Sequence, residues 1–191
     1  MQSARSDEFT IGATRLRLRT LIRLRWIAVI GQSIAVLVVY TVFGYDLPLA
    51  FCFALIALSA WLNIFLRIRY PVSRDLKSPM ATALLGYDIV QLAALLALTG
   101  GLANPFSILL LVPVVVSASA LPPGNTVALG ATALLAASLI GAVHLPLPWV
   151  AGDEPDLPVL YLAGIWVALA LAIGFTGVYA FRVAREARQM S

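Results

Sequence analysis

Apolar residues run along this chain in long blocks, separated by short stretches that contain glycine, proline or charged residues. An α-helix needs roughly 20 apolar residues to cross a hydrocarbon core about 30 Å thick. The blocks have about that length, so the pattern predicts an all-α integral membrane protein. The six expected transmembrane helices cover residues 26–43, 49–66, 81–99, 106–121, 125–143 and 159–181.

Composition agrees with a membrane protein and excludes a soluble globular domain. Of the 191 residues, 61% are hydrophobic and 12% are charged, and the mean hydropathy is +0.95. Such a chain has too few polar residues to cover a soluble surface. The single cysteine, Cys52, lies within the second block, so no disulfide within the chain is possible. We interpret Cys52 as a small buried apolar residue.

The basic residues predict the orientation, because Lys and Arg near the ends of spans stay in the cytoplasm. All 13 fall into three groups, before the first span, between the second and third, and after the sixth. Six spans place these groups on one side, so both termini are predicted to be cytoplasmic. The residues are Arg5, Arg15, Arg17, Arg19, Arg23, Arg25, Arg67, Arg69, Arg74, Lys77, Arg182, Arg185 and Arg188.

Three regions are expected along the chain. Residues 1–25 form a basic amphipathic segment on the cytoplasmic interface, residues 26–181 form the six-helix domain, and residues 182–191 begin a cytoplasmic signalling helix. The net charge of +4 could suggest nucleic acid, but basic residues at span ends are explained by topology and anionic lipid headgroups. We therefore expect membrane lipid as a partner and no direct contact with nucleic acid.

Asp88 lies well inside the third predicted span, where an ionised carboxylate needs a partner. Gln32, Asn63 and Gln91 lie at similar depths in the first three spans, which predicts an intramembrane polar cluster of these four residues. One interpretation is structural, with Asp88 bound to Asn63 or Gln32 or paired with Arg67. The other is a proton-coupled or signal-sensitive switch.

The sequence GGLANPF, residues 100–106, joins the third and fourth spans. Structurally, Gly100 or Gly101 can end a helix in a left-handed conformation, Asn104 can cap the next helix, and Pro105 suits its first turn. The same stretch could bind a ligand, with close backbone approach at the glycines, free amides at the helix start and an aromatic wall at Phe106. His144 either belongs to an interfacial belt or faces this same outer site.

Two stretches give the chain its resemblance to a known family, GGLANPF and the basic entry into the first span, RLRTLIRLRWIAVIGQ. The chain resembles the membrane domain of the RegB/PrrB/ActS family of redox-responsive sensor histidine kinases. That family carries a GGxxNPF heptapeptide implicated in quinone binding. The resemblance assigns the heptapeptide role to Gly100, Gly101, Asn104, Pro105 and Phe106.

The resemblance implies a two-component sensor in the bacterial inner membrane, with ubiquinone or a related quinone as ligand and a homodimer as the assembly. It also implies a cytoplasmic kinase core after the sixth span, which would use ATP and act on a response regulator. This chain ends at Ser191, so we expect no catalytic residues in it. Its one histidine, His144, lies on the outer side and is not expected to accept a phosphoryl group.

Two other function classes remain open from the residues alone. A small transporter or channel subunit could use Asp88, Gln91 and Gln32 as a polar path. A membrane enzyme would need a catalytic set, and one His, one Cys and no clustered carboxylates in the spans predict neither a nucleophile nor a metal site.

Overall fold

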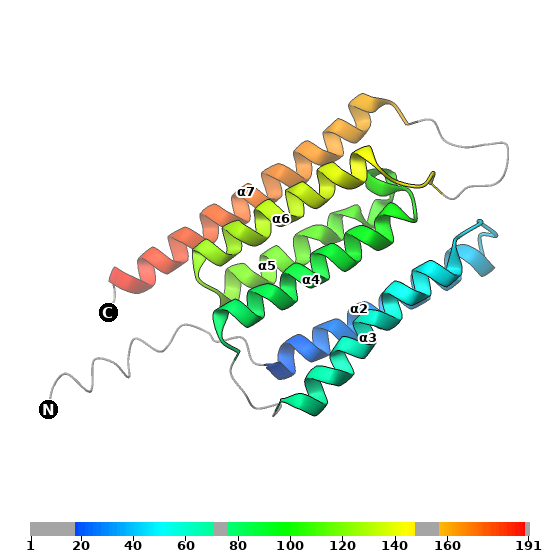
Figure 1. Ribbon diagram of the computed structural model, residues 1–191. Coiled ribbons are helices and arrows are strands. Elements are labelled where there is room, and N and C mark those ends of the chain that lie inside the picture. The colour runs from blue at the N-terminus through cyan, green and yellow to red at the C-terminus, as the bar shows by residue number, and fades with distance from the viewer. Residues whose placement is uncertain (1–17, 71–75, 148–156, 190–191) are drawn as a thin grey trace, which may run out of the picture.

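The computed structural model describes residues 18–70, 76–147 and 157–189, which are helical with short connections (Figure 1). No strand occurs within these ranges, and the predicted all-α fold is confirmed. The elements are α2 (Leu18–Thr41), α3 (Leu49–Arg69), α4 (Ser78–Ala97), the 3₁₀ helices η1 (Gly101–Ala103) and η2 (Pro105–Leu110), α5 (Leu111–Ala120), α6 (Pro123–Ala142) and α7 (Val159–Gln189).

Five of these helices are long and apolar enough to cross a membrane, namely α2, α3, α4, α6 and α7. The fourth predicted span is a shorter apolar helix, Pro105–Ala120, that starts as η2 and continues as α5. A 3₁₀ helix rises about 2.0 Å per residue and an α-helix about 1.5 Å. The combined helix is therefore about 27 Å long, close to the thickness of a hydrocarbon core.

Pro113 explains where the 3₁₀ geometry ends. We expected this proline to kink a continuous helix, since it lacks the amide that would bind back along the chain. In the structure it is the third residue of α5, directly after the 3₁₀ helix η2. The helix therefore changes type two residues before the proline.

The beginning of α2 differs from the expected interfacial segment. The helix starts at Leu18, so residues 18–25 are its first turns, while residues 1–17 lie outside the described part of the chain. Leu18, Leu21, Ile22 and Arg25 are buried against the other helices. Their spacing of three and four residues places them on one face of the helix, so this basic stretch packs into the protein on that side.

The helices run alternately up and down, and α2 pairs with α3 beside the group formed by α4, α5, α6 and α7 (Figure 1). The α3–α4 connection, the α5–α6 turn and the end of α7 lie at the same end as the start of α2. The basic residues of the three groups that the structure describes are therefore gathered at one end, as expected. The side of the membrane that this end faces stays a prediction.

Small residues allow close packing on one side of the bundle. Ala133 and Ala137 of α6 are fully buried, and a Cβ added at Gly130 would lie 2.8 Å from the Ile173 side chain of α7. Close approach of this kind holds helices together in lipid, where apolar burial does not. Gly164 of α7, in contrast, has open space beside it.

Candidate functional site

The heptapeptide GGLANPF turns the chain between α4 and α5 with two glycines in the left-handed region. Gly100 has a φ of 110° and Gly101 a φ of 60°, values that other residues rarely adopt. A Cβ at Gly101 would press against the carbonyl oxygen of Ile140 and the ring of His144, and one at Gly100 would press against Leu147. These glycines are thus required by the backbone and by close packing against the end of α6 and the residues after it.

Asn104 holds the loop together through both ends of its side-chain amide. Its Nδ2 donates to the carbonyl oxygen and to the Oγ1 of Thr99, both at 2.9 Å. Its Oδ1 accepts from the backbone N–H of Phe106 at 2.9 Å, which caps η2 as predicted. The donors of this side chain are therefore engaged within the loop.

The expected free amides at this helix start are also engaged. Pro105 has no N–H, the amide of Phe106 binds the Asn104 side chain, and the amide of Ser107 binds the Asn104 carbonyl oxygen at 2.9 Å. The anticipated positive helix end is therefore not open to a ligand here. The sequence predicted the capping residue correctly. It did not show that the cap also binds the amides that we expected to be free for a ligand.

Phe106 and the apolar surface after it remain accessible. The Phe106 side chain is 46% exposed. An open hollow of about 270 Å³ follows along η2 and α5, with almost wholly apolar lining. The lining residues are Ile108, Leu109, Leu111, Val112, Val115 and Val116. This surface offers apolar contact and almost no hydrogen-bonding groups.

His144 is brought against the heptapeptide. Its ring lies next to Gly101, as the contact of an added Cβ shows, and its Nδ1 is 2.7 Å from the carbonyl oxygen of Leu145. Because a carbonyl oxygen only accepts, Nδ1 carries the hydrogen and Nε2 of the neutral ring is left as an acceptor. The amide of Leu145 donates to the carbonyl oxygen of Ala97 at 2.7 Å, which fastens this segment to the end of α4.

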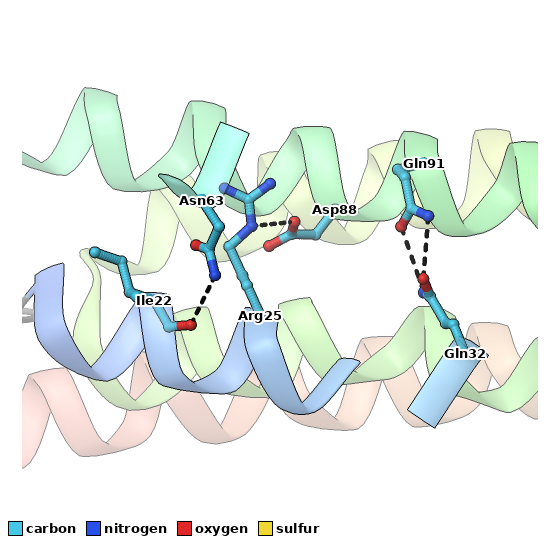
Figure 2. A network of polar contacts seen from close by, with 6 residues as sticks. All are labelled: Ile22, Arg25, Gln32, Asn63, Asp88 and Gln91. Atoms are coloured by element: carbon cyan, nitrogen blue, oxygen red, sulfur yellow. Dashed lines mark hydrogen bonds and ion pairs between the residues drawn. The ribbon is translucent and has the colours of Figure 1, made fainter. Parts of the chain in front are cut away.

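Asp88 forms an ion pair with Arg25, with 2.9 Å between Oδ1 and Nε (Figure 2). The expected partners of Asp88 were Asn63, Gln32 and Arg67, and none of them takes this place. Sequence reasoning assigned Arg25 to the cytoplasmic segment and missed it. The i, i+3 and i+7 spacing of Leu18, Leu21 and Arg25 is the signal that would have placed Arg25 on the buried face of α2.

The other members of the expected polar cluster form two separate contacts (Figure 2). Gln32 and Gln91 pair through reciprocal amide hydrogen bonds of 3.1 and 3.4 Å, which join α2 to α4. Asn63 donates to the carbonyl oxygen of Ile22 at 3.0 Å, which joins α3 to α2. Together with Arg25 and Ile22, the four residues therefore connect three consecutive helices, α2, α3 and α4.

Among the residues that the structure describes, no group of three or more His, Cys, Asp and Glu side chains could hold a metal ion. Cys52 is buried as a free thiol.

A family model for the PilS-like transmembrane domain matches residues 16–190. The sensor histidine kinase RegB of Cereibacter sphaeroides is 42% identical over 175 residues, which are 92% of this chain and 38% of that protein. RegB of Cereibacter sphaeroides strain ATCC 17023 is also 42% identical, over 176 residues with the same shares. The chain thus spans well under half the length of these relatives. No solved structure matches it.

These similarities cover nearly the whole chain and include both the first helix and the heptapeptide. The resemblance noted from GGLANPF and the basic entry into the first span is confirmed, and with it a multi-pass location in the bacterial inner membrane. The chain belongs to the PilS-like transmembrane domain family, as a membrane sensor domain of the RegB type.

Proposed function

We propose that this chain is the input domain of a redox-responsive two-component histidine kinase and that it senses the quinone pool of the membrane. The observation that carries the proposal is the 42% identity to the sensor histidine kinase RegB over 92% of the chain. The kinase core, its ATP and its response regulator belong to the rest of such a protein, which acts as a homodimer.

The heptapeptide region supports a quinone site of a particular kind. The donors of Asn104 and the first amides of η2 are engaged, so the quinone ring is held mainly by apolar contact with Phe106 and with the hollow along η2 and α5. A quinone enters from lipid and leaves its tail there, which fits an open apolar surface. The glycines and Asn104 serve by holding Phe106 in place, and Nε2 of His144 is an acceptor on a ring that lies against Gly101.

A route from this region to the end of the chain is present in the packing. The 3₁₀ helix η1 contacts α4, α6 and α7, and α5 also packs on α7. Helix α7 is 31 residues long, about 46 Å, and continues to Gln189 without interruption. A shift of the loop would therefore reach α7 directly. Quinone and quinol can bias such a shift only through a difference in their affinities for the two arrangements.

The test is a ubiquinone titration of the chain in lipid nanodiscs, followed by tryptophan fluorescence. Phe106→Ala removes the exposed ring and should weaken saturable quenching roughly tenfold, because an aromatic contact and its buried area are lost. Phe51→Ala is the matched control, since Phe51 is 67% exposed in the first turn of α3, at the same end of the bundle. Equal quenching curves for wild type and both variants would show that Phe106 does not contribute to quinone binding.

Asn104→Ala gives an independent arm of the same experiment. The substitution deletes two hydrogen bonds to Thr99 and the cap of η2, so it should displace Phe106 and weaken quinone binding without removing any ligand contact. Joined to its kinase core, the variant should also lose the difference in autophosphorylation between quinone and quinol. Retention of that difference would contradict the proposed site.

A further inference from the structure

Three side chains from three different helices carry buried polar atoms without hydrogen-bond partners. They are the three guanidinium nitrogens of Arg25 on α2, Oδ1 of Asn63 on α3 and the hydroxyl oxygen of Tyr87 on α4, and of these atoms Nε of Arg25 lies in the ion pair with Asp88. Arg25 is 3% exposed and Asn63 is fully buried. The ion pair with Asp88 involves Nε, so four N–H donors of the guanidinium remain.

Asn63 of α3 and Tyr87 of α4 both lie beside Arg25 of α2. Asn63 binds the carbonyl oxygen of Ile22, one turn before Arg25 on the same face of α2. The Cζ atom of Arg25 is 5.0 Å from the centre of the Tyr87 ring. Figure 2 shows Asn63 and Asp88 on either side of the guanidinium group, with its two terminal nitrogens turned away from the bond to Asp88.

The unpaired atoms define what could bind there. Buried donors without acceptors cost free energy, so the four N–H groups favour an acceptor oxygen. Oδ1 of Asn63 accepts only, so the same group must also donate. An added charge is disfavoured because Arg25 and Asp88 already neutralise each other. An uncharged hydroxyl oxygen meets all of these conditions, whereas a carbonyl oxygen cannot donate to Asn63.

We propose that Arg25, Asn63 and Tyr87 form a second polar site, which binds one uncharged hydroxyl oxygen. The oxygen accepts from a terminal nitrogen of Arg25 and from the Tyr87 hydroxyl, and it donates to Oδ1 of Asn63. It comes either from a water molecule or from the hydroxyl of a reduced quinone. The quinol source rests on the proposed function, and the water source does not.

The site has a consequence for redox discrimination if the oxygen belongs to a quinol. Reduction converts a quinone carbonyl, which only accepts, into a hydroxyl, which accepts and donates. The quinol satisfies both Arg25 and Asn63, and the quinone leaves Asn63 unpaired. The site therefore prefers the reduced ligand, and it connects the α2–α3 pair to α4 when occupied.

The first experiment is a structure of the chain in nanodiscs of quinone-free lipid, determined with a bound antibody fragment at a resolution that shows ordered water. Density within hydrogen-bond distance of an Arg25 terminal nitrogen and of Asn63 Oδ1 is expected for the water source. Density at this place in the quinone-free sample supports the proposal whether or not the chain proves to bind quinone.

The second experiment separates the sources by titrating ubiquinol and ubiquinone against wild type, Tyr87→Phe and Asn63→Leu. Tyr87→Phe removes only the hydroxyl and keeps the ring under Arg25, and Tyr161→Phe on exposed α7 is the control. For a quinol, both site variants should weaken ubiquinol binding roughly fivefold, the loss of about one hydrogen bond. Asn63→Leu should leave ubiquinone binding unchanged, whereas Tyr87→Phe should weaken it too, because a carbonyl oxygen also accepts from the Tyr87 hydroxyl.

The combined outcomes decide the proposal. Unchanged affinities together with density in the quinone-free structure identify water. Unchanged affinities without density, with the Arg25 terminal nitrogens bound to protein oxygens, overturn the site. Failure of wild type to bind either form of ubiquinone would contradict the proposed function alone, because the density experiment still tests the water source.

Discussion

At the scale of single residues, the ion pair of Arg25 and Asp88 places two charges inside the protein. Arg25 is almost fully buried and Asp88 is 22% exposed, so their pairing occurs where water screens it weakly. Desolvating two charges is expensive, and a buried pair is often no more stable than two apolar side chains of similar size. Removal of one partner is different, because it leaves an uncompensated charge inside the protein.

Asp88→Leu should therefore lower the free energy of unfolding by about 3–5 kcal/mol, as is typical when one partner of a buried pair is removed. The double variant Arg25→Met/Asp88→Leu should recover most of that loss. Unfolding in mixed bicelles, titrated with a denaturing detergent, measures both values. Arg67→Met is the control, since Arg67 is exposed at the same end of the bundle. A loss for Asp88→Leu no larger than the control would mean that the guanidinium reaches water.

Sequence reasoning identified Asp88 as a residue in need of a partner but assigned the wrong ones. The partner was hidden because Arg25 comes directly before the apolar run and obeys the rule for cytoplasmic charges. The helix that continues back to Leu18 carries Arg25 into the protein. Which side chains pair between two helices depends on how each helix is rotated about its axis relative to the other. The positions of apolar blocks along the sequence do not determine that relative rotation.

At the scale of elements, the heptapeptide follows α4 in the chain and packs against α6 and α7. Its conformations were predictable, because glycine in the left-handed region, an Asn cap and proline in the first helical turn each follow from local chemistry. Its packing was not, because Gly101 lies against Ile140 and His144, which are far away in the sequence. The amides that we expected to be free for a ligand instead donate to Asn104. This is the same local capping that made the loop predictable.

Gly101→Ala should destabilise the chain by about 2–4 kcal/mol, from a strained φ of 60° and from the forced contact with Ile140 and His144. Gly31→Ala is the matched control, because Gly31 lies within α2 with nothing within 4 Å of an added Cβ. In a helix this control should be neutral or slightly stabilising. Detergent-induced unfolding of the two variants measures the difference, and equal stabilities would show that the loop can move away from α6.

At the scale of the whole molecule, alternation of the helices and clustering of basic residues at one end agree with each other. The count of spans was predictable because each apolar block is about as long as a bilayer is thick. The fourth span was the least regular, since its first turns are 3₁₀. The orientation itself follows from the charge rule and calls for a direct measurement.

Labelling with a membrane-impermeant thiol reagent tests the orientation in intact cells. Cys52→Ala removes the one native thiol, which is buried, and gives a background for single cysteines. In that background, Asp46→Cys should react from outside, and Lys77→Cys should react only after the cells are opened. The reverse pattern would contradict the predicted cytoplasmic location of both termini.

The helix Pro105–Ala120 has a length that depends on its geometry. Conversion of the six residues of η2 from 3₁₀ to α would shorten it by about 3 Å and rotate its start relative to α5. A span whose hydrophobic length differs from the thickness of the surrounding hydrocarbon costs fractions of a kcal/mol for each Å of mismatch. Such a conversion would therefore couple the thickness of the adjacent bilayer to the angular position of Phe106.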